Sequence, residues 1–231
     1  MKYKVLDLFS GTGSVSKALK RYNHVECISV DLFTVDSHKP TFQEDILTWK
    51  YWEHFKPGEI HAIFAGCPCD TFSKINNMLK TPRPKEQIDH GIAMVKKTIE
   101  IVKYLKPKYY FIENPRYGSM HKLPCMRGRK RVHCNYCMYG FDYPKPTTIF
   151  TNHPDLKLKV CNGRCSQYVI DNKKHYGGTL TYIQDNNSLG KARPKSERSC
   201  YPPTLIHDIF EQTDVIPKTR SGRVSRPPVF G

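Results

Sequence analysis

The stretch Val5-Leu6-Asp7-Leu8-Phe9-Ser10-Gly11-Thr12-Gly13-Ser14 indicates the fold of this chain. A mostly apolar run, typical of a β-strand, leads into a loop with two glycines. Glycine lets the backbone turn sharply and lets a ligand approach it closely. In open α/β sheets such loops lie at the carboxyl edge of the strands, where ligands bind. The stretch therefore predicts the first strand of an α/β sheet, followed by a loop that either binds a ligand or only turns the chain.

Strand and helix signals alternate through the first two thirds of the chain. The predicted strands are Lys4–Phe9, Glu26–Val30, Thr41–Asp45, Ile60–Ala65 and Tyr109–Ile112. Helices are predicted over Val15–Arg21 and Gln87–Leu105, the second from apolar residues three and four positions apart, and Pro107 should end it. Such alternation predicts a doubly wound α/β sheet that is mainly parallel and has helices on both faces.

The pattern weakens after Pro124. There we expect strands over Arg131–Met138 and Thr147–Thr151, and a helix that begins at Pro202-Pro203. The length of 231 residues suits one α/β domain with a small appended lobe. The expected organisation is a main domain over 1–152 and 197–212, a small basic lobe over 153–196, and a basic disordered tail over 213–231.

The chain carries a formal net charge of +16. A surplus of this size favours a polyanionic partner such as a nucleic acid, although a solvated basic face would have the same composition. The apolar runs are too short to span a membrane and we find no secretory signal, so we expect an intracellular protein without a membrane partner.

Nine cysteines, an odd number, argue against a disulfide framework. The pairs Cys134/Cys137 and Cys161/Cys165 have the spacing of zinc ligands, and four thiolates would suit a structural zinc site. If the strand over Arg131–Met138 is continuous, however, the first two thiols point to opposite faces. A turn at Asn135 would remove this objection. His133 or His175 are alternative ligands, and cysteines packed as small apolar residues are the alternative to a metal site.

Four further strand ends carry reactive or acidic side chains. Asp31 ends the second predicted strand, where a carboxylate can hold both hydroxyls of a ribose, and Asp45 ends the third, where it could contact an adenine edge. The loop Gly66-Cys67-Pro68-Cys69-Asp70-Thr71-Phe72-Ser73 follows the fourth, and a cysteine held there is poised as a nucleophile. The segment Tyr109-Tyr110-Phe111-Ile112-Glu113-Asn114-Pro115 ends in a carboxylate.

A glycine loop, a Pro-Cys loop and a Glu-Asn pair, each after a strand and in this order, resemble the motifs of the cytosine-5 DNA methyltransferase family. The resemblance covers about residues 3–151 and 197–212 and is closest to the short phage and large-DNA-virus members. It implies a Rossmann-like sheet that binds S-adenosylmethionine, and it implies as cofactor contacts Asp7, Phe9, Gly11, Gly13, Asp31 and Asp45. The alternative is an ordinary dinucleotide-binding fold.

The resemblance also implies three catalytic roles. Cys69 would add to carbon-6 of cytosine, Glu113 would hold cytosine N3 and the exocyclic amine, and Arg131 would support the base. Cys67 competes for the first role, but only Cys69 follows a proline, as the family pattern requires. Arg131 has a plain alternative as a solvated strand end. The family's C-terminal segment, which returns to the first strands and touches the cofactor, corresponds to Tyr201-Pro202-Pro203.

The implied partner is duplex DNA, with the target base flipped out of the helix because Cys69 cannot reach a stacked base. Loop 70–86 would close over the base, and residues 153–196 would recognise the target sequence. We expect a monomer, located in the cytoplasm or nucleus of the host cell if the source is viral. An RNA or tRNA cytosine-5 methyltransferase of the same fold and a catalytically silent nucleic-acid-binding protein remain alternatives.

Overall fold

The computed structural model describes residues 2–73, 83–163, 165, 168–169, 174–175, 181–185, 188–192 and 195–216. The strands are β1 (Tyr3–Leu8), β2 (Val25–Asp31), β3 (Phe42–Gln43), β4 (Ala62–Ala65), β5 (Tyr109–Pro115), β6 (Lys130–Asn135), β7 (Pro146–Thr151), β8 (Tyr168–Val169), β9 (Lys174–His175), β10 (Thr181–Asp185) and β11 (Ser188–Ala192). The α-helices are α1 (Ser14–Leu19), α2 (Tyr51–His54), α3 (Lys85–Leu105), α4 (Lys195–Ser199) and α5 (Pro203–Glu211). Short 3-10 turns are η1 (Cys69–Thr71), η3 (Met120–Lys122), η4 (Pro124–Met126) and η5 (Tyr136–Tyr139).

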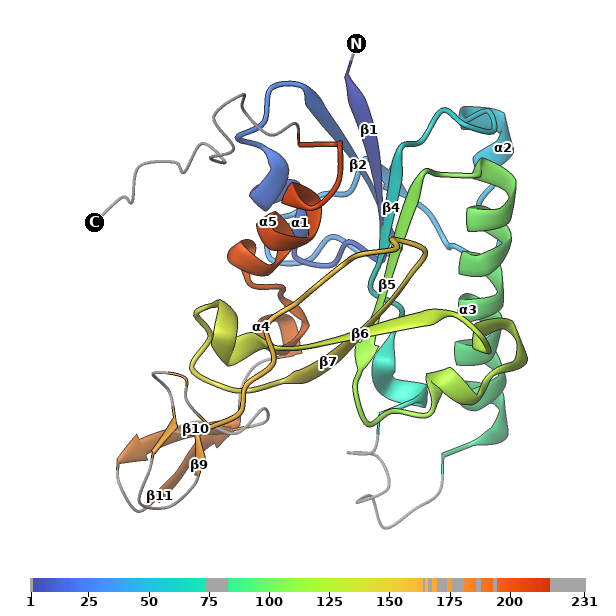
Figure 1. The fold of residues 1–231 in the computed structure, drawn as a ribbon. Helices are drawn as coiled ribbons and strands as arrows, with labels where there is room; N and C mark the ends of the chain where they lie inside the picture. Colours follow the sequence, from blue (N-terminus) through green and yellow to red (C-terminus); the bar gives the residue numbers. More distant parts are fainter. Residues whose placement is uncertain are drawn as a thin grey trace.

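A seven-stranded sheet with the order β3-β2-β1-β4-β5-β7-β6 forms the centre of the molecule (Figure 1). The first five strands of this order are parallel, and β7 runs antiparallel to both β5 and β6. The chain order reverses between β1 and β4, which is the switch point of a doubly wound sheet. The predicted fold class is therefore confirmed, and the antiparallel edge arises because β6 returns to β7 through a short connection rather than a crossover helix.

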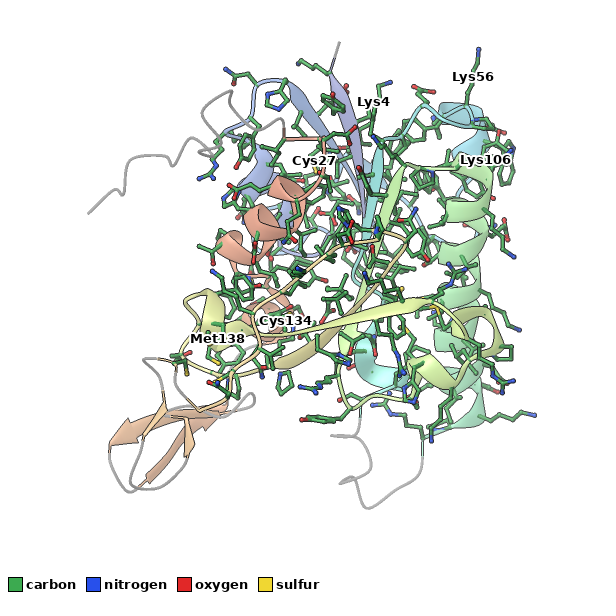
Figure 2. All side chains as sticks on the ribbon, viewed as in Figure 1. Lys4, Cys27, Lys56, Lys106, Cys134 and Met138 are labelled. Carbon is green, nitrogen blue, oxygen red and sulfur yellow. The ribbon has the colours of Figure 1, made fainter. Side chains whose placement is uncertain are left out.

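Helices cover both faces of the sheet, with α1 and α5 on one side and α2 and α3 on the other (Figure 1). Neighbouring residues of β1 divide between the two layers: Val5 packs in the cluster with α1 and α5, and Leu6 packs in the cluster with α3. Side chains fill both layers (Figure 2). Because the parallel strands are buried on both faces, they read in the sequence as nearly continuous apolar runs.

Helix α3 shows how the sequence pattern becomes packing. Its buried side chains include Val95, Ile99, Val102 and Leu105, as the spacing predicts. Ile88, the first apolar residue of the pattern, is 37% exposed. The helix ends at Leu105 because Lys106 takes a left-handed conformation (φ 49°) and Pro107 cannot continue it. In Figure 2, Lys106 and Lys56 mark the amino edge of the sheet, opposite the strand ends described below.

Two expectations are corrected by the structure. The strand expected over Arg131–Met138 is too long: β6 ends at Asn135, and Tyr136–Tyr139 form η5. The turn forms there because the N–H of Tyr136 donates to Pro144 O (2.7 Å) instead of extending the ladder. The tail expected from residue 213 is also wrong at its start, because Thr213, Val215 and Ile216 are buried. Val215 and Ile216 belong to the apolar cluster around α1 and α5.

The expected lobe over 153–196 begins in contact with the main domain. Leu156 is buried in the cluster around α5, and the ring of His153 stacks on Tyr109 at 5.2 Å. Farther along, β8 pairs with β9 and β10 pairs with β11, each as an antiparallel hairpin. Residues 217–231, which include the basic part of the expected tail, lie outside the described residues. Within the described part, no helix is both long and apolar enough to span a membrane.

Candidate active site

A cavity of about 440 Å³ lies at the carboxyl edge of the sheet. It is lined by residues at the ends of β1, β2, β4 and β5, by η1 and α3, by the segments after β3 and before β7, and by the approach to α5. The lining residues are Phe9, Ser10, Gly11, Val30, Asp31, Leu32, Phe33, Glu44, Asp45, Ile46, Gly66, Cys67, Pro68, Cys69, Asp70, His90, Met94, Glu113, Lys145, Ser199 and Tyr201.

The order of the strands arranges this lining. Since β3, β2 and β1 are neighbours, Asp45, Asp31 and the glycine loop follow one another along the edge of the sheet. Since β4 and β5 continue the sheet, Cys69 and Glu113 lie toward its other end. A cavity of this size at the switch point is the usual position of a ligand site in an open α/β sheet.

The acidic end of the cavity is organised around Asp31. Its Oδ2 accepts the N–H of Gly11 (2.8 Å) and its Oδ1 accepts the N–H of Phe33 (3.0 Å), so the carboxylate is held at the lip of the glycine loop. Asp45 lies farther along, with Oδ1 accepting the N–H of Leu47 (2.9 Å). Phe33, which the sequence interpretation missed, is 64% exposed and offers an apolar face at this end.

Four of the six predicted cofactor residues, Phe9, Gly11, Asp31 and Asp45, line the cavity. The other two, Asp7 and Gly13, are not among its lining residues. Asp7 is buried, neither of its carboxylate oxygens has a hydrogen-bond partner among the described residues, and burial raises its pKa well above the ordinary value, with a further contribution from Asp31. Gly13 begins α1 with φ 73°, and a Cβ there would collide with the ring of His38.

Cys69 begins η1 and is half-buried at the cavity. Burial raises the pKa of its thiol above the ordinary value of 9.0, the charge of Glu113 raises it further, and Lys145 opposes both effects. Cys67 also borders the cavity but is buried, with its sulfur 3.6 Å from the hydroxyl of Thr98. The more accessible of the two thiols is therefore Cys69.

Glu113 lies near the end of β5 and is only 5% exposed. Its Oε1 has no hydrogen-bond partner among the residues that the structure describes. Burial raises the pKa of the carboxyl group above 4.5, while Lys145 and a hydrogen bond with Thr147 lower it. A buried, unpartnered carboxyl oxygen facing a cavity is suited to bind a polar ligand atom.

Lys145 is the cavity residue that sequence reasoning missed most clearly. It lies between Pro144 and Pro146 with φ 23°, a strained conformation for a residue with a side chain. Its ammonium group is 4.6 Å from the ring centroid of Tyr136 and 5.7 Å from that of Tyr201. It reaches the cavity because β7 starts at the edge where β5 ends. A lone lysine before a strand gives no such signal in the sequence.

The structure does not bring Arg131 to this cavity. Arg131 is exposed on β6 and lines a separate small recess together with Arg116, His121 and Thr148. No lining residue of the main cavity comes from β6.

The approach to α5 closes the cavity from the far end of the chain. Ser199 and Tyr201 line it, the N–H of Tyr201 donates to Ser14 Oγ (3.2 Å), and Cys200 Sγ lies 3.3 Å from Thr12 Oγ1. The C-terminal segment thus returns to the first strands, as the sequence interpretation expected. Of the expected closing loop 70–86, residues 74–82 lie outside the described part of the chain.

Three of the four predicted metal-ligating thiols gather at one point. The sulfur atoms of Cys137, Cys161 and Cys165 lie within 4.8 Å of one another. Cys134 does not belong to this group, because it is 0% exposed and packs in the core on β6 (Figure 2). The side chain of His175, an alternative ligand, is outside the described part of the structure.

Comparisons with known proteins agree with the motifs at this cavity. A family model for C-5 cytosine-specific DNA methylase matches residues 3–121. The "Probable DNA (cytosine-5)-methyltransferase" of Frog virus 3 (isolate Goorha) is 28% identical over 219 residues, which cover 90% of this chain and 99% of the relative.

Two solved structures are also similar in part. One is the "putative DNA modification methyltransferase encoded within prophage" of E. coli, with a TM-score of 0.48, 19% identity, and coverage of 65% of this chain and 46% of that chain. The other is the Entamoeba histolytica methyltransferase EhMeth, with a TM-score of 0.49, 15% identity, and coverage of 70% and 57%. The chain thus spans about half the length of the solved structures it matches.

Proposed function

Because the chain belongs to the C-5 cytosine-specific DNA methylase family, we propose that it transfers a methyl group from S-adenosylmethionine to carbon-5 of cytosine in DNA, through a covalent adduct with Cys69. The observation that carries this proposal is the single cavity in which Cys69 and Glu113 share walls with the strand-end carboxylates Asp31 and Asp45. A nucleophile, a buried acid and a nucleoside-binding edge are the three parts that the reaction needs.

The acidic end of the cavity fits the cofactor. Asp31 has its carboxylate fixed by two backbone N–H groups and suits the two hydroxyls of a ribose. Asp45 suits an exocyclic amine, and the exposed ring of Phe33 suits the face of an adenine. When bound, S-adenosylmethionine would supply a methyl group activated by its positively charged sulfur.

Cys69 would act as the nucleophile. Carbon-5 of cytosine reacts poorly until a thiolate has added to carbon-6, which makes the ring an enamine. Free thiols are only a few per cent ionised at neutral pH, and burial lowers that fraction at Cys69. After methylation, loss of the carbon-5 proton and expulsion of the Cys69 thiolate would restore the aromatic ring.

Glu113 would make the addition possible by acting on cytosine N3. The addition of a thiolate places negative charge on the ring, and a proton delivered to N3 neutralises it. Burial of Glu113 favours the protonated carboxyl group that such a transfer requires. No described residue of the protein donates a hydrogen bond to Glu113 Oε1, and the bound base would then supply one.

Lys145 would supply a positive charge at the part of the cavity where Cys69 and Glu113 lie. Its charge lowers the pKa of both Cys69 and Glu113, so it stabilises the thiolate form of Cys69. The neighbouring rings of Tyr136 and Tyr201 hold the ammonium group beside the cavity. We therefore assign to Lys145 the supporting role that the sequence interpretation gave to Arg131.

DNA would reach this site with the target cytosine flipped out of the duplex, because the cavity is a recess at the end of the sheet and a stacked base cannot enter it. The net charge of +16 supports binding to the phosphate backbone, with an affinity that falls as salt is added. Sequence recognition by residues 153–196 is part of the same proposal.

The test is methyl transfer from labelled S-adenosylmethionine to unmethylated duplex DNA, with tRNA as a parallel substrate and nucleosides identified by mass spectrometry. We expect 5-methyldeoxycytidine from the wild-type protein and none from Cys69→Ser. Cys67→Ser is the matched control, because it alters the neighbouring thiol, which packs against Thr98, and should keep activity.

A second measurement tests the covalent step directly. DNA with 5-fluorocytosine at the target should form an adduct that survives denaturation, because fluorine at carbon-5 is not lost as a proton is. Cys69→Ser should abolish this adduct. The DNA proposal fails if 5-methylcytidine appears only in tRNA, and the catalytic proposal fails if neither substrate is methylated although S-adenosylmethionine binds.

A further inference from the structure

A group of three thiols lies outside the cavity and takes no part in the proposed reaction. Cys137 belongs to η5, whereas Cys161 and Cys165 follow β7 by ten or more residues. Their sulfur atoms lie within 4.8 Å of one another, and none of the three belongs to a disulfide in the described structure. None of them lines the cavity of Cys69.

Hydrogen bonds to the end of β6 and to η5 hold the second segment beside the first. The N–H of Asn135 donates to Lys159 O (3.1 Å), and the N–H of Cys161 donates to the side-chain oxygen of Asn135 (3.0 Å). The N–H of Lys159 donates to the hydroxyl of Tyr139 (2.8 Å). These bonds place Cys161 next to Cys137 without help from the thiols themselves, so the group is built into the fold.

The turn after Cys161 is shaped to present sulfur as a ligand. Gly163 has φ 82°, a conformation that favours glycine, and its N–H points at Cys161 Sγ (3.4 Å). A backbone N–H donated to sulfur stabilises a negatively charged thiolate, which is the form that binds a metal.

We propose that Cys137, Cys161 and Cys165 bind a structural zinc ion, which fastens the segment leading to hairpins β8–β9 and β10–β11 onto the main domain. Thiolates on tetrahedral zinc at about 2.3 Å are about 3.8 Å apart, so the sulfur atoms need only small movements to meet one ion. Soft thiolate ligands select zinc over magnesium or calcium.

The number and the surroundings of the thiols favour a metal over the alternatives. A disulfide uses two sulfur atoms and would leave the third without a partner. Cys161 and Cys165 are half-buried and Cys137 is 5% exposed, whereas Cys134, which packs in the core, is 0% exposed. His133 is not in the group, and its Nδ1 lies 2.9 Å from the hydroxyl of Thr148.

The first test measures zinc in the full-length protein, purified under reducing conditions, equilibrated with zinc chloride and passed through a desalting column. Elemental mass spectrometry should find about one zinc per chain. Cys137→Ser, Cys161→Ser and Cys165→Ser should each lower the zinc content about tenfold or more. Cys125→Ser is the matched control, since Cys125 is half-buried but outside the group, and should retain zinc.

A second readout covers the case in which a serine variant does not fold. Cobalt bound to the wild-type protein should give a thiolate-to-cobalt charge-transfer band and the visible bands of a tetrahedral site. Zinc below about one tenth per chain in the wild-type protein, absence of the cobalt bands, or full zinc retention in all three variants would each overturn the proposal. Because none of these measurements uses methyl transfer, their outcome is independent of the proposed function.

Discussion

A methyl group at Gly66 should disturb the contact between the Cys69 loop and the C-terminal segment. Gly66 follows β4 and faces Tyr201. A Cβ atom built on Gly66 would lie less than 3.0 Å from Tyr201 Oη and 3.1 Å from Tyr201 Cζ. A Cβ atom this close to Tyr201 Oη would be a steric clash, so Gly66→Ala must displace either Tyr201 or the Cys69 loop.

Tyr201 has little room to move away. It is buried, its ring packs edge-on against Phe64 at 5.0 Å, and its N–H is bonded to Ser14 Oγ. Forcing an extra methyl group into such a site costs about 1–3 kcal/mol. For a chain of this size, each kcal/mol lowers the melting temperature by about 2–4 °C, so Gly66→Ala should lose about 2–12 °C.

The assay is thermal unfolding, together with calorimetric titration of S-adenosylmethionine. Tyr201 also lines the cavity, so its displacement in Gly66→Ala should weaken cofactor binding. The affinity should fall about tenfold for each 1.4 kcal/mol by which the displacement destabilises the complex with S-adenosylmethionine. Tyr201→Phe removes the Oη atom and leaves Cζ as the nearest obstacle. The double variant should therefore recover at least about half of the lost stability, with a coupling energy of about 1 kcal/mol.

Tyr201→Phe alone is the control for the loss of the hydroxyl group. The reasoning is refuted if Gly66→Ala melts within about 1 °C of the wild-type protein. It is also refuted if the penalty of the alanine is the same with tyrosine and with phenylalanine at position 201, because the steric contact would then not be its cause.

Two further predictions concern the charges of Cys69, Glu113 and Lys145. The profile of kcat/KM against pH should be bell-shaped. The acidic limb lies at the pKa of Glu113, which is raised above 4.5, because at lower pH Cys69 and Glu113 both hold a proton and no thiolate forms. The basic limb lies at the pKa of Cys69, which is raised above 9.0, because at higher pH neither group has a proton to give to N3. A flat profile over pH 5–10 would contradict this pairing. Lys145→Met removes the charge that lowers both pKa values, so steady-state kinetics should show about a 100-fold loss in kcat/KM and both limbs moved to higher pH, while Lys145→Arg keeps the limbs in place. A loss of rate without movement of the limbs would make Lys145 a purely structural residue.

The predicted site residues that line the cavity share one property. Gly11, Asp31, Asp45, Cys69 and Glu113 each end or follow a parallel strand. In a parallel sheet the carboxyl ends of all strands meet at one edge, so local strand signals are enough to predict which side chains come together. No knowledge of long-range contacts is needed to that point.

Lys145 and Arg131 could not be placed in this way, because both belong to the antiparallel edge. Which of them reaches the cavity depends on the register of β7 against β5, in which Pro115 pairs with Thr147. That register comes from contacts between residues about 30 positions apart, and a one-residue shift would reverse every side chain of the strand. The local pattern around either residue contains no information about it.

The cysteines illustrate the same limit at a turn. The spacing of Cys134 and Cys137 suggested a pair, but the strand ends at Asn135 and only Cys137 turns toward Cys161. The carbonyl oxygens that accept the hydrogen bonds at this turn belong to Pro144 and Lys159, which lie outside the segment from Cys134 to Cys137. Spacing alone therefore predicted three cysteines that do come together and included Cys134, which packs in the core instead.

Several buried polar atoms without a hydrogen-bond partner lie near the edge of the sheet that carries the cavity. Among the described residues, Asp7, Ser10, Glu113, Asn114 and Tyr136 have such atoms at the ends of β1 and β5 or at the start of η5, and His38, Trp49 and Arg83 have them in other parts of the chain. Each such atom costs about 1–3 kcal/mol in a folded protein. A fold optimised only for stability would pair them or replace them with apolar groups. Of these residues, Ser10 and Glu113 line the cavity, so on the proposed function the cofactor and the flipped base would supply the missing partners of these two groups.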